Sequence, residues 1–206
     1  MTSDDVATSA VSARERILTA AYELFSRRGI RSVGTDEVIA RAGVAKATLY
    51  RHFATKDALV LAVLRRREEV WTHNLIEEQS RLRGDTPEEQ LLAIFDVLHD
   101  WFQQRDGYEG CSFINVLLEM GADHPVGEAC IAHIDHVRDI VRRRAVAAGL
   151  TDVEDLASSW HILMKGAIIL AAVGDLDAAR RARKMAGALI EQHRPADPGD
   201  LGQAAG

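Results

Sequence analysis

Residues 35–53 have the sequence TDEVIARAGVAKATLYRHF, and this stretch decides the fold that we expect for the whole chain. Gly43 divides it into two short helical patterns, because glycine readily adopts the backbone conformation that ends a helix in a sharp turn. The second pattern is polar and basic and carries few apolar anchors. In a helix-turn-helix unit, one helix braces across the DNA backbone while the next offers its N-terminal side chains to base edges in the major groove. The stretch therefore predicts a DNA-binding head.

A helix that precedes this stretch supplies the third element of the head. Over residues 13–28, apolar residues recur at helical spacing, and Gly29 follows as a stop. Ser12 and Glu15 have the spacing of a capping box, and we expect Thr35 to cap the second helix. The anchors of the third helix are expected to be Val44, Leu49 and Phe53.

The distribution of charge supports a nucleic-acid-binding head. The chain of 206 residues has a formal net charge of -6, which by itself is unfavourable for binding DNA. Residues 13–67, however, hold 12 Lys+Arg against 5 Asp+Glu, a formal charge of +7, and the remainder holds 13 against 26, a formal charge of -13. A basic head on an acidic body concentrates the attraction for phosphate in one part of the molecule.

The chain as a whole is expected to be all-α. Hydrophobic residues make up 47% of the sequence and aromatic residues 5%, a composition that favours helices over a β-sandwich. The apolar spacing predicts about nine helices, and both Thr86-Pro87-Glu88-Glu89 and Thr151-x-x-Glu154 have sequences typical of a helix start. Beyond the head, the expected helices cover about 56–82, from Thr86 to near Gly107, 111–120, 126–148, 151–173 and 175–193.

The composition also divides the chain and indicates its compartment. The expected parts are a disordered N-terminus over 1–12, the helix-turn-helix domain over 13–57, a helical body over 58–193 and a flexible tail over 194–206. The acidic N-terminus lacks the features of a signal peptide, and the most apolar stretch, 166–173, is too short to cross a bilayer. Two cysteines do not make a secreted disulfide framework. We therefore expect a cytoplasmic protein that does not associate with membranes.

A specific pattern of anchors, turn and polar positions covers about residues 11–71. It comprises Arg16-Ile17-Leu18, Gly29, Thr35, Ile39-Ala40, Ala42-Gly43-Val44, Thr48-Leu49-Tyr50, His52-Phe53 and Lys56-Asp57-Ala58-Leu59. This segment resembles the DNA-binding domain of the tetracycline-repressor (TetR/AcrR) family, and the remainder resembles the family's C-terminal domain in helix number and length. The resemblance implies a homodimer that binds a palindromic operator in double-stranded DNA and usually represses transcription. It also implies that residues 58–193 form a ligand-binding and dimerisation domain, and that a small molecule entering it releases the DNA.

The third helix of the head carries most of the side chains that we expect to meet DNA. Lys46, Thr48 and Tyr50 have groups suited to base edges, phosphates or a thymine methyl. By resemblance, Lys56 is the main phosphate clamp. Ala45 departs from the family pattern, in which many relatives carry Ser or Thr, and the loss of such a cap costs about 0.5–2 kcal/mol. The predicted DNA-binding set is Arg31, Thr35, Ala45, Lys46, Ala47, Thr48, Tyr50, Arg51, His52 and Lys56.

Plainer roles stay open for some of these basic and aromatic residues. Tyr50 and His52 would alternatively be half-buried against the first helix. Arg51 would alternatively be a solvated surface charge. The run Arg65-Arg66-Arg67 is interpreted first as a solvated helix face that adds to the positive potential of the head.

The last two expected helices are candidates for the dimer interface. Residues 160–173 are apolar nearly all round, which requires cover on more than one side of the helix. The following helix carries small residues that allow close approach, so two copies of the pair would form a four-helix interface. The alternative is that both helices only complete the core of one chain. The expected interface residues are Trp160, Met164, Ile168, Ala179, Ala182, Met185, Ala186, Leu189 and Ile190.

The body also holds the large apolar side chains from which a ligand pocket would be built. Pockets for apolar ligands combine such linings with a few polar groups. The candidate lining is Trp71, Asn74, Phe95, Trp101, Phe102, Phe113, Asn115, Leu117, Met120, His133, Trp160 and Met164. The alternative for each of these residues is an ordinary place in the core. The expected ligand is therefore a small and largely apolar molecule of unknown identity.

Other chemistries receive less support from the sequence. Cys130, His133 and His136 span too wide an arc of one helix to converge on a metal ion, so we expect no metal site. A redox switch of Cys111 and Cys130 is an alternative to their ordinary role as small buried hydrophobes. No catalytic motif stands out, so we expect neither enzyme activity nor a cofactor. The competing functions are an activator, a ligand-independent regulator, and a scavenging module with a vestigial head, against which the +7 charge of the head argues.

Overall fold

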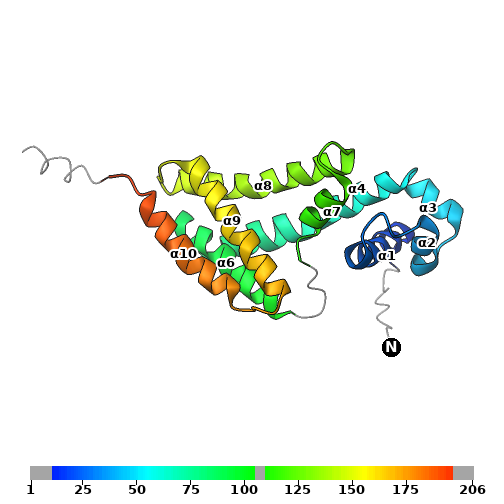
Figure 1. The fold of residues 1–206 in the computed structure, drawn as a ribbon, viewed down its shortest axis with the longest axis horizontal. Coiled ribbons are helices and arrows are strands. Elements are labelled where there is room, and N and C mark those ends of the chain that lie inside the picture. The colour runs from blue at the N-terminus through cyan, green and yellow to red at the C-terminus, as the bar shows by residue number, and fades with distance from the viewer. Residues whose placement is uncertain (1–10, 105–109, 197–206) are drawn as a thin grey trace, which may run out of the picture.

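The computed structural model describes residues 11–104 and 110–196. These residues form nine helices and no strand when the uninterrupted helical run over 56–82 is counted once, which confirms the all-α prediction. The N-terminal helices form a head at one end of an elongated molecule, and the later helices form the body (Figure 1). Within the described residues, no helix is both long and apolar enough to span a membrane. Most of the predicted disordered N-terminus and tail, and the expected helix end near Gly107, lie outside the described residues.

The head consists of α1 (Ala13–Arg28), α2 (Thr35–Ala42) and α3 (Lys46–His52). Ser12 caps α1 as predicted, because its hydroxyl accepts a hydrogen bond of 3.1 Å from the Glu15 backbone N–H. The reciprocal half of the predicted capping box is not formed, since the Glu15 carboxylate pairs with Arg66 instead. Gly43 ends α2 in the left-handed conformation, with φ 61°, which makes room for the turn into α3. The head is therefore a helix-turn-helix unit built on a local sequence pattern.

The prediction that Thr35 caps α2 is wrong. The N-cap position is Gly34, and Thr35 is the first residue of the helix itself. The Thr35 hydroxyl lies 3.3 Å from the Tyr50 hydroxyl instead, so it links the start of α2 to α3.

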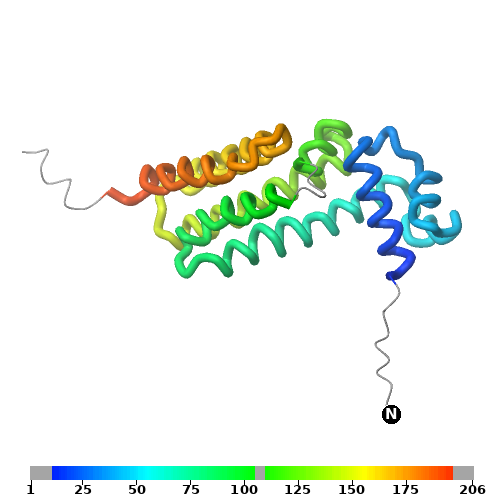
Figure 2. Tube along the Cα trace, turned by 90° about the horizontal axis from the view of Figure 1, so that it is seen from below, coloured from blue at the N-terminus to red at the C-terminus, as the bar shows by residue number. Residues whose placement is uncertain are grey.

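One helical run leads from the head into the body, over the residues predicted for it. It comprises α4 (Lys56–Arg67), the π-helical segment η1 (Glu68–Glu78) and α5 (Gln79–Leu82). Figure 2 shows this run extending from the head along the length of the body. The sequence pattern did not predict the π-helical segment, a form that is rare and is frequently found at functional sites. The run is the direct mechanical link between the two parts of the molecule.

The body is completed by five helices with bounds close to those expected. They are α6 (Pro87–Gln103), α7 (Ser112–Met120), α8 (Pro125–Ala147), α9 (Val153–Ala172) and α10 (Ala178–Gln192). The predicted capping box at Thr86 is confirmed, since Thr86 accepts from Glu89 N–H and Glu89 accepts from Thr86 N–H. The last helix begins at Ala178 rather than Asp175, because 175–177 form a turn in which Ala178 N–H donates to Asp175.

The predicted capping box at Thr151 is also wrong. The residue before α9 is Asp152, which has a φ of 45° and makes no side-chain cap. Thr151 instead donates from its backbone N–H at 2.7 Å and from its hydroxyl at 3.0 Å to the carbonyl of His193. These bonds tie the turn before α9 to the end of α10.

Two apolar clusters form the core. The body cluster is contributed by η1, α6, α8, α9 and α10, with Phe95 and Trp160 among its largest members. The head cluster contains residues of α1, α2 and α3, but it continues into α4 and includes Phe113 of α7 and Cys130 of α8. The head therefore shares its core with one end of the body. The apolar packing crosses the expected division between residues 57 and 58.

Candidate nucleic-acid interface

The third helix of the head is held by apolar anchors and presents its other side chains to solvent. Leu49 and Phe53 are buried as predicted, and Val44 is half-buried. Tyr50 is 42% exposed, which disfavours the alternative that its main role is packing against the first helix. The side chains left on the outer face of the head are Ala45, Lys46, Ala47, Arg51 and His52, with Thr48 half-buried beside them.

The start of α3 has no side-chain cap, as expected from an alanine at position 45. Ala45 is the N-cap residue and makes no side-chain hydrogen bond to the helix. Lys46 is exposed, and its ammonium lies 3.2 Å from the carboxylate of Asp36 on α2. Because exposed ion pairs of this kind contribute only about 0–1 kcal/mol, Lys46 can exchange Asp36 for a phosphate or a base at little cost.

The remaining predicted contact residues lie on the turn between α1 and α2, at the start of α2, on α3 and at the start of α4. Thr35 and Tyr50 are brought together by their hydroxyl contact, and Arg31 is exposed on the turn between α1 and α2. Lys56 is partly buried, and its ammonium donates to the carbonyl of Ile30 at 2.5 Å. Lys56 therefore holds the α1–α2 turn in the free protein, a role that the sequence did not indicate.

The arginine run on α4 is not simply a solvated face. Arg66 pairs with Glu15 of α1 at 2.7 Å and donates to the Thr19 hydroxyl at 3.0 Å. Arg67 lies over the rings of Tyr22 on α1, at 5.5 Å, and of Trp101 on α6, at 5.8 Å. These contacts join α4 to the head and connect Arg67 to both parts of the molecule.

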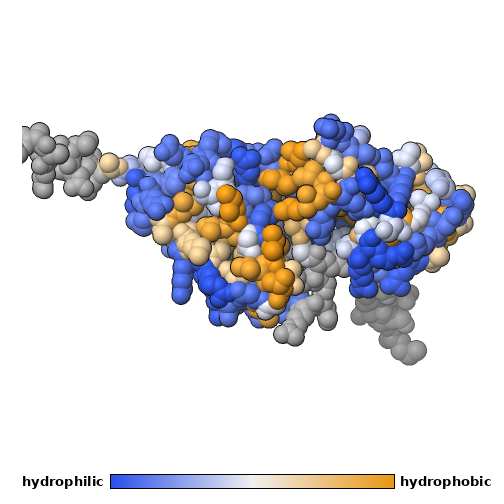
Figure 3. Space-filling model, in the orientation of Figure 1, coloured by the Kyte–Doolittle hydropathy of each residue, from blue (hydrophilic) through white to orange (hydrophobic). Residues whose placement is uncertain are grey.

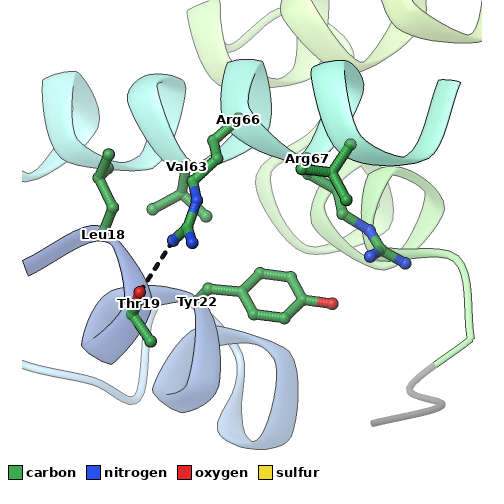
Figure 4. Close-up of a pocket in the computed structure, with 7 residues that line it drawn as sticks. Leu18, Thr19, Tyr22, Val63, Arg66 and Arg67 are labelled. Atoms are coloured by element: carbon green, nitrogen blue, oxygen red, sulfur yellow. Dashed lines mark hydrogen bonds between the residues drawn. The ribbon is translucent and has the colours of Figure 1, made fainter. Parts of the chain in front are cut away.

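A small cleft of about 140 Å³ lies beside these arginines, between α1 and α4. Figure 4 shows the Arg66 guanidinium bonded to Thr19 at its edge, with Tyr22 and Arg67 further along the same opening. Its apolar floor comes from Leu18 and Val63.

A second cleft, which we call the junction cleft, has a volume of about 220 Å³ and lies where α1, α4 and α7 meet. Tyr22, Phe25 and Leu64 line its apolar side, and Ser112, Asn115, Glu119 and Arg67 supply polar groups. Glu119 also reaches the head, because its carboxylate accepts from the backbone N–H groups of Ile30, at 2.8 Å, and Arg31, at 2.5 Å.

The predicted pocket residues do not line a single cavity. Asn115 lines the junction cleft, whereas Asn74 and Trp101 line a separate open groove beside η1 and α6. Phe113 stacks on His133 with ring centroids 3.2 Å apart. The packed remainder divides between the two cores, with Trp71, Phe95, Phe102, Trp160 and Met164 in the body cluster and Leu117 and Met120 against the head cluster. Apolar residues alone did not distinguish a filled core from a lining.

The predicted dimer residues are also mostly internal. The structure buries Trp160, Met164, Ile168, Ala179, Ala182, Ala186 and Ile190 within their own chain, so they offer no surface to a second copy. Of the remaining two, Leu189 is half-buried and Met185 is 58% exposed. The apolar surface of α9 is a different set of residues, namely Ile162, Ile169 and Leu170, together with Val173 directly after the helix. Figure 3 shows apolar surface gathered over this helix.

The cysteines and histidines give no metal arrangement. Over 11–104 and 110–196, no three His, Cys, Asp or Glu side chains are grouped so that they could hold an ion. Both cysteines are free, and burial, together with Cys111 nearby, raises the pKa of the Cys130 thiol to about 12. Because the thiolate is the reactive form, this environment gives the redox alternative no support.

Comparisons with known proteins agree with this geometry. Residues 17–63 match the family model described as "Bacterial regulatory proteins, tetR family", and residues 87–185 match that of the "Transcriptional regulator LmrA/YxaF-like, C-terminal domain". The fold is similar to the crystal structure of a TetR-family transcriptional regulator from Streptomyces coelicolor, with a TM-score of 0.80 and 28% identity. That similarity covers 88% of this chain and 95% of the other.

Two curated relatives extend the comparison. The HTH-type transcriptional activator FasR of Mycolicibacterium smegmatis is 34% identical over 164 residues, and the match covers 71% of this chain and 71% of FasR. The uncharacterized HTH-type transcriptional regulator YvdT of Bacillus subtilis is 35% identical over 86 residues, and the match covers 42% of this chain and 41% of YvdT. The chain therefore belongs to the TetR family of bacterial transcriptional regulators, and its N-terminal helix-turn-helix head is the DNA-binding part.

Proposed function

We propose that this protein is a cytoplasmic homodimer that represses transcription from a palindromic operator and leaves the DNA when a small molecule binds the body. The observation that carries the proposal is the way the head is joined to the body. Glu119 of α7 holds the turn that links α1 to α2, and the same residue lines the junction cleft. A molecule in this cleft would therefore act directly on the contact that orients the head.

The outer face of α9 supports the homodimer. Ile162, Ile169, Leu170 and Val173 are spaced so that they fall on one side of the helix, and Ile162 is 70% and Val173 78% exposed. Met185 of α10 is also exposed. An exposed apolar face of this kind is typical of an interaction site. A second copy is the partner that we propose, because two heads related by a two-fold axis match two half-sites about 34 Å apart.

The proposed mechanism needs a ligand that prefers one head orientation over another. The helical run over 56–82 carries apolar residues of the head core in α4 and of the body core in η1, so a tilt of this run moves the head relative to the dimer face. The change in DNA affinity equals the differential affinity of the ligand for the two orientations, typically about 1–3 kcal/mol. Recognition helices displaced in this way no longer match successive major grooves.

The direct test measures binding of the purified protein to the DNA upstream of its own gene. We expect a footprint over a palindrome, lost in Lys46→Ala and Tyr50→Ala, while Lys184→Ala on α10 serves as an exposed control far from α3. A reporter driven by the same DNA should be more active in cells that lack the gene. Equal affinity for the upstream DNA and for random DNA would contradict operator binding at this location.

An activator is the second candidate, and one comparison favours it. FasR, which is 34% identical over 164 residues, is named a transcriptional activator. The same reporter separates the two functions, since loss of an activator lowers expression whereas loss of a repressor raises it. The DNA-binding head and the proposed dimer are common to both.

A further inference from the structure

Lys165 is a buried cation whose contacts are unusual. It lies on α9, is only 9% exposed, and its ammonium donates to Cys111 Sγ at 3.3 Å and sits 5.5 Å from the ring centre of Trp71. Across the parts of the chain that the structure describes, no carboxylate forms an ion pair with it. A thiol is a weak acceptor, and a buried charge without a strong partner is costly. The ammonium is therefore incompletely compensated.

Several polar atoms are also buried without a hydrogen-bond partner, on residues that contact Lys165, interact with its charge or neighbour Cys111. They are Trp71 Nε1, Ser112 Oγ, His133 Nδ1 and His161 Nδ1, contributed by η1, α7, α8 and α9. Native proteins leave few buried polar atoms unsatisfied, and each one calls for an explanation, such as a partner that binds there. His133 Nδ1 already faces Glu68 at 3.6 Å, and the other three atoms, beside one buried ammonium, indicate a site that is completed by a bound molecule.

The charges near Lys165 show which sign that molecule must have. Burial first, and then the charge of Lys165, lower the pKa values of His133 and His161 to about 3, so both rings are neutral near pH 7. Arg67 adds positive charge on the side of His133. Arg138 adds it on the side of His161, where it is itself paired with Asp135 at 3.1 Å. The nearby acid, Glu68, is already bonded to His136 at 2.5 Å and lies 3.6 Å from His133 Nδ1. The cluster is therefore positive and suited to an anion.

The same cluster borders the junction cleft. Ser112 and Arg67 line that cleft, and the neighbouring Cys111, which contacts Lys165, packs against both apolar cores. Tyr22, Phe25 and Leu64 offer an apolar surface on the other side of the opening. An occupant with an anionic end at Lys165 and an apolar end in the cleft would contact both regions. Because Lys165 supplies one buried positive charge, a monoanion balances it, whereas a phosphate dianion would carry a second buried charge without a partner.

We infer that Lys165 binds the carboxylate of a small organic acid whose apolar or aromatic part occupies the junction cleft. Such a ligand neutralises the buried ammonium and places its apolar part beside Glu119, which holds the head. The inference rests on the proposed ligand response and names its chemical class. It can nevertheless be tested without DNA.

The test compares two probes of nearly the same shape, 2-naphthoate and the uncharged 2-naphthamide. Binding to the full-length protein is measured by calorimetry and by quenching of tryptophan fluorescence, since Trp71 adjoins Lys165. We expect the acid to bind at least about tenfold more tightly than the amide, as a charge-assisted contact implies. Lys165→Met should abolish this preference and retain binding of the amide. Lys184→Met, the same change at an exposed site on α10, should keep it.

Two further measurements test whether the effect of Lys165→Met comes from a loss of folding or from the contact with Cys111. Lys165→Met should melt at the same or a higher temperature than the unaltered protein, because it replaces a poorly compensated buried charge with an apolar side chain. Cys111→Ser should retain the preference for the acid. Failure of the acid to bind the unaltered protein, equal binding of acid and amide, or an unchanged preference in Lys165→Met would each overturn the inference. Binding through Lys165 without any effect on operator affinity would instead contradict only the proposed release mechanism.

Discussion

Glu119 in the body and Ile30 in the head are joined by a hydrogen bond of 2.8 Å from the Ile30 backbone N–H to the Glu119 carboxylate. The backbone carbonyl of Ile30 accepts a hydrogen bond of 2.5 Å from the Lys56 ammonium. The turn between α1 and α2 is therefore held both by α7 and by α4. Gly29, with a φ of 80°, allows this approach, since a Cβ there would lie 3.0 Å from Glu119 Oε2. The contact gives the head a defined orientation on the body.

Replacing Glu119 should therefore affect both stability and regulation. In Glu119→Ala, the partly buried Ile30 N–H loses its acceptor, so we expect the free energy of unfolding to fall by about 1–3 kcal/mol. Operator binding should persist, because the DNA-facing side chains are untouched, but its response to a ligand should weaken. Urea denaturation and operator titrations with and without the ligand measure the two effects.

Glu128→Ala provides the control for this change, since Glu128 is an exposed carboxylate on α8. It should leave stability and ligand response unchanged. A Glu119→Ala protein with full stability and a full ligand response would show that the contact does not orient the head.

The helices of the head could be predicted from the sequence because their determinants are local. Gly43, Leu49 and Phe53 act within a stretch of nineteen residues, where turn chemistry and helical spacing determine the structure locally. The body was harder to predict, because α9 is apolar on two faces. Spacing alone did not show that Trp160 and Met164 face the chain's own core while Ile162 and Val173 face solvent.

The polar contacts that matter most were invisible to sequence patterns for a related reason. Glu119 meets Ile30 across 89 positions and Lys165 meets Cys111 across 54, and no local spacing encodes either pair. Thr151 shows the converse, since a good local capping sequence is overridden by its hydrogen bonds to His193. Long-range contacts decided these three sites.

The salt dependence of DNA binding should report the role of Lys46. If Lys46 contacts one phosphate in each protomer, Lys46→Ala should reduce the slope of log K against log salt by about 1.8 for the dimer. Asp36→Asn should strengthen binding modestly, because it removes the carboxylate that lies 3.2 Å from Lys46. Operator titrations over a range of salt concentrations measure both. An unchanged slope in Lys46→Ala would place Lys46 away from the phosphates.

The dimer should depend on the exposed face of α9. Val173→Asp places a charge in the proposed interface of each protomer, and we expect the dissociation constant of the dimer to rise at least about a hundredfold. Val146→Asp on α8, at a residue that is also well exposed, is the matched control and should leave the dimer intact. Sedimentation equilibrium distinguishes these outcomes. Equal dimerisation of both variants would show that another surface forms the interface.

The buried histidines predict how stability depends on pH. Burial lowers the pKa of His133 to about 3, from 6.5, so below pH 6.5 the unfolded chain takes up a proton that the folded chain does not. Above about pH 6.5, His133 should therefore not change the free energy of unfolding. Between about pH 6.5 and pH 3, it should lower the free energy of unfolding by at most about 1.4 kcal/mol for each pH unit of decrease. His161 has the same environment and the same sign, with Lys165 adding to the effect at both rings.

Urea denaturation between about pH 5 and 7, above the range in which most carboxylates titrate, isolates this effect. His133→Gln should have a shallower dependence on pH than the unaltered protein, because one proton-uptake site of the unfolded chain is removed. His136→Gln, three residues further along α8 at an exposed position, should not reproduce this flattening to the same extent. If His133→Gln and the unaltered protein lose stability in parallel as the pH falls, His133 is protonated in the folded protein, and the Lys165 cluster is not the positive, poorly solvated environment inferred from its contacts.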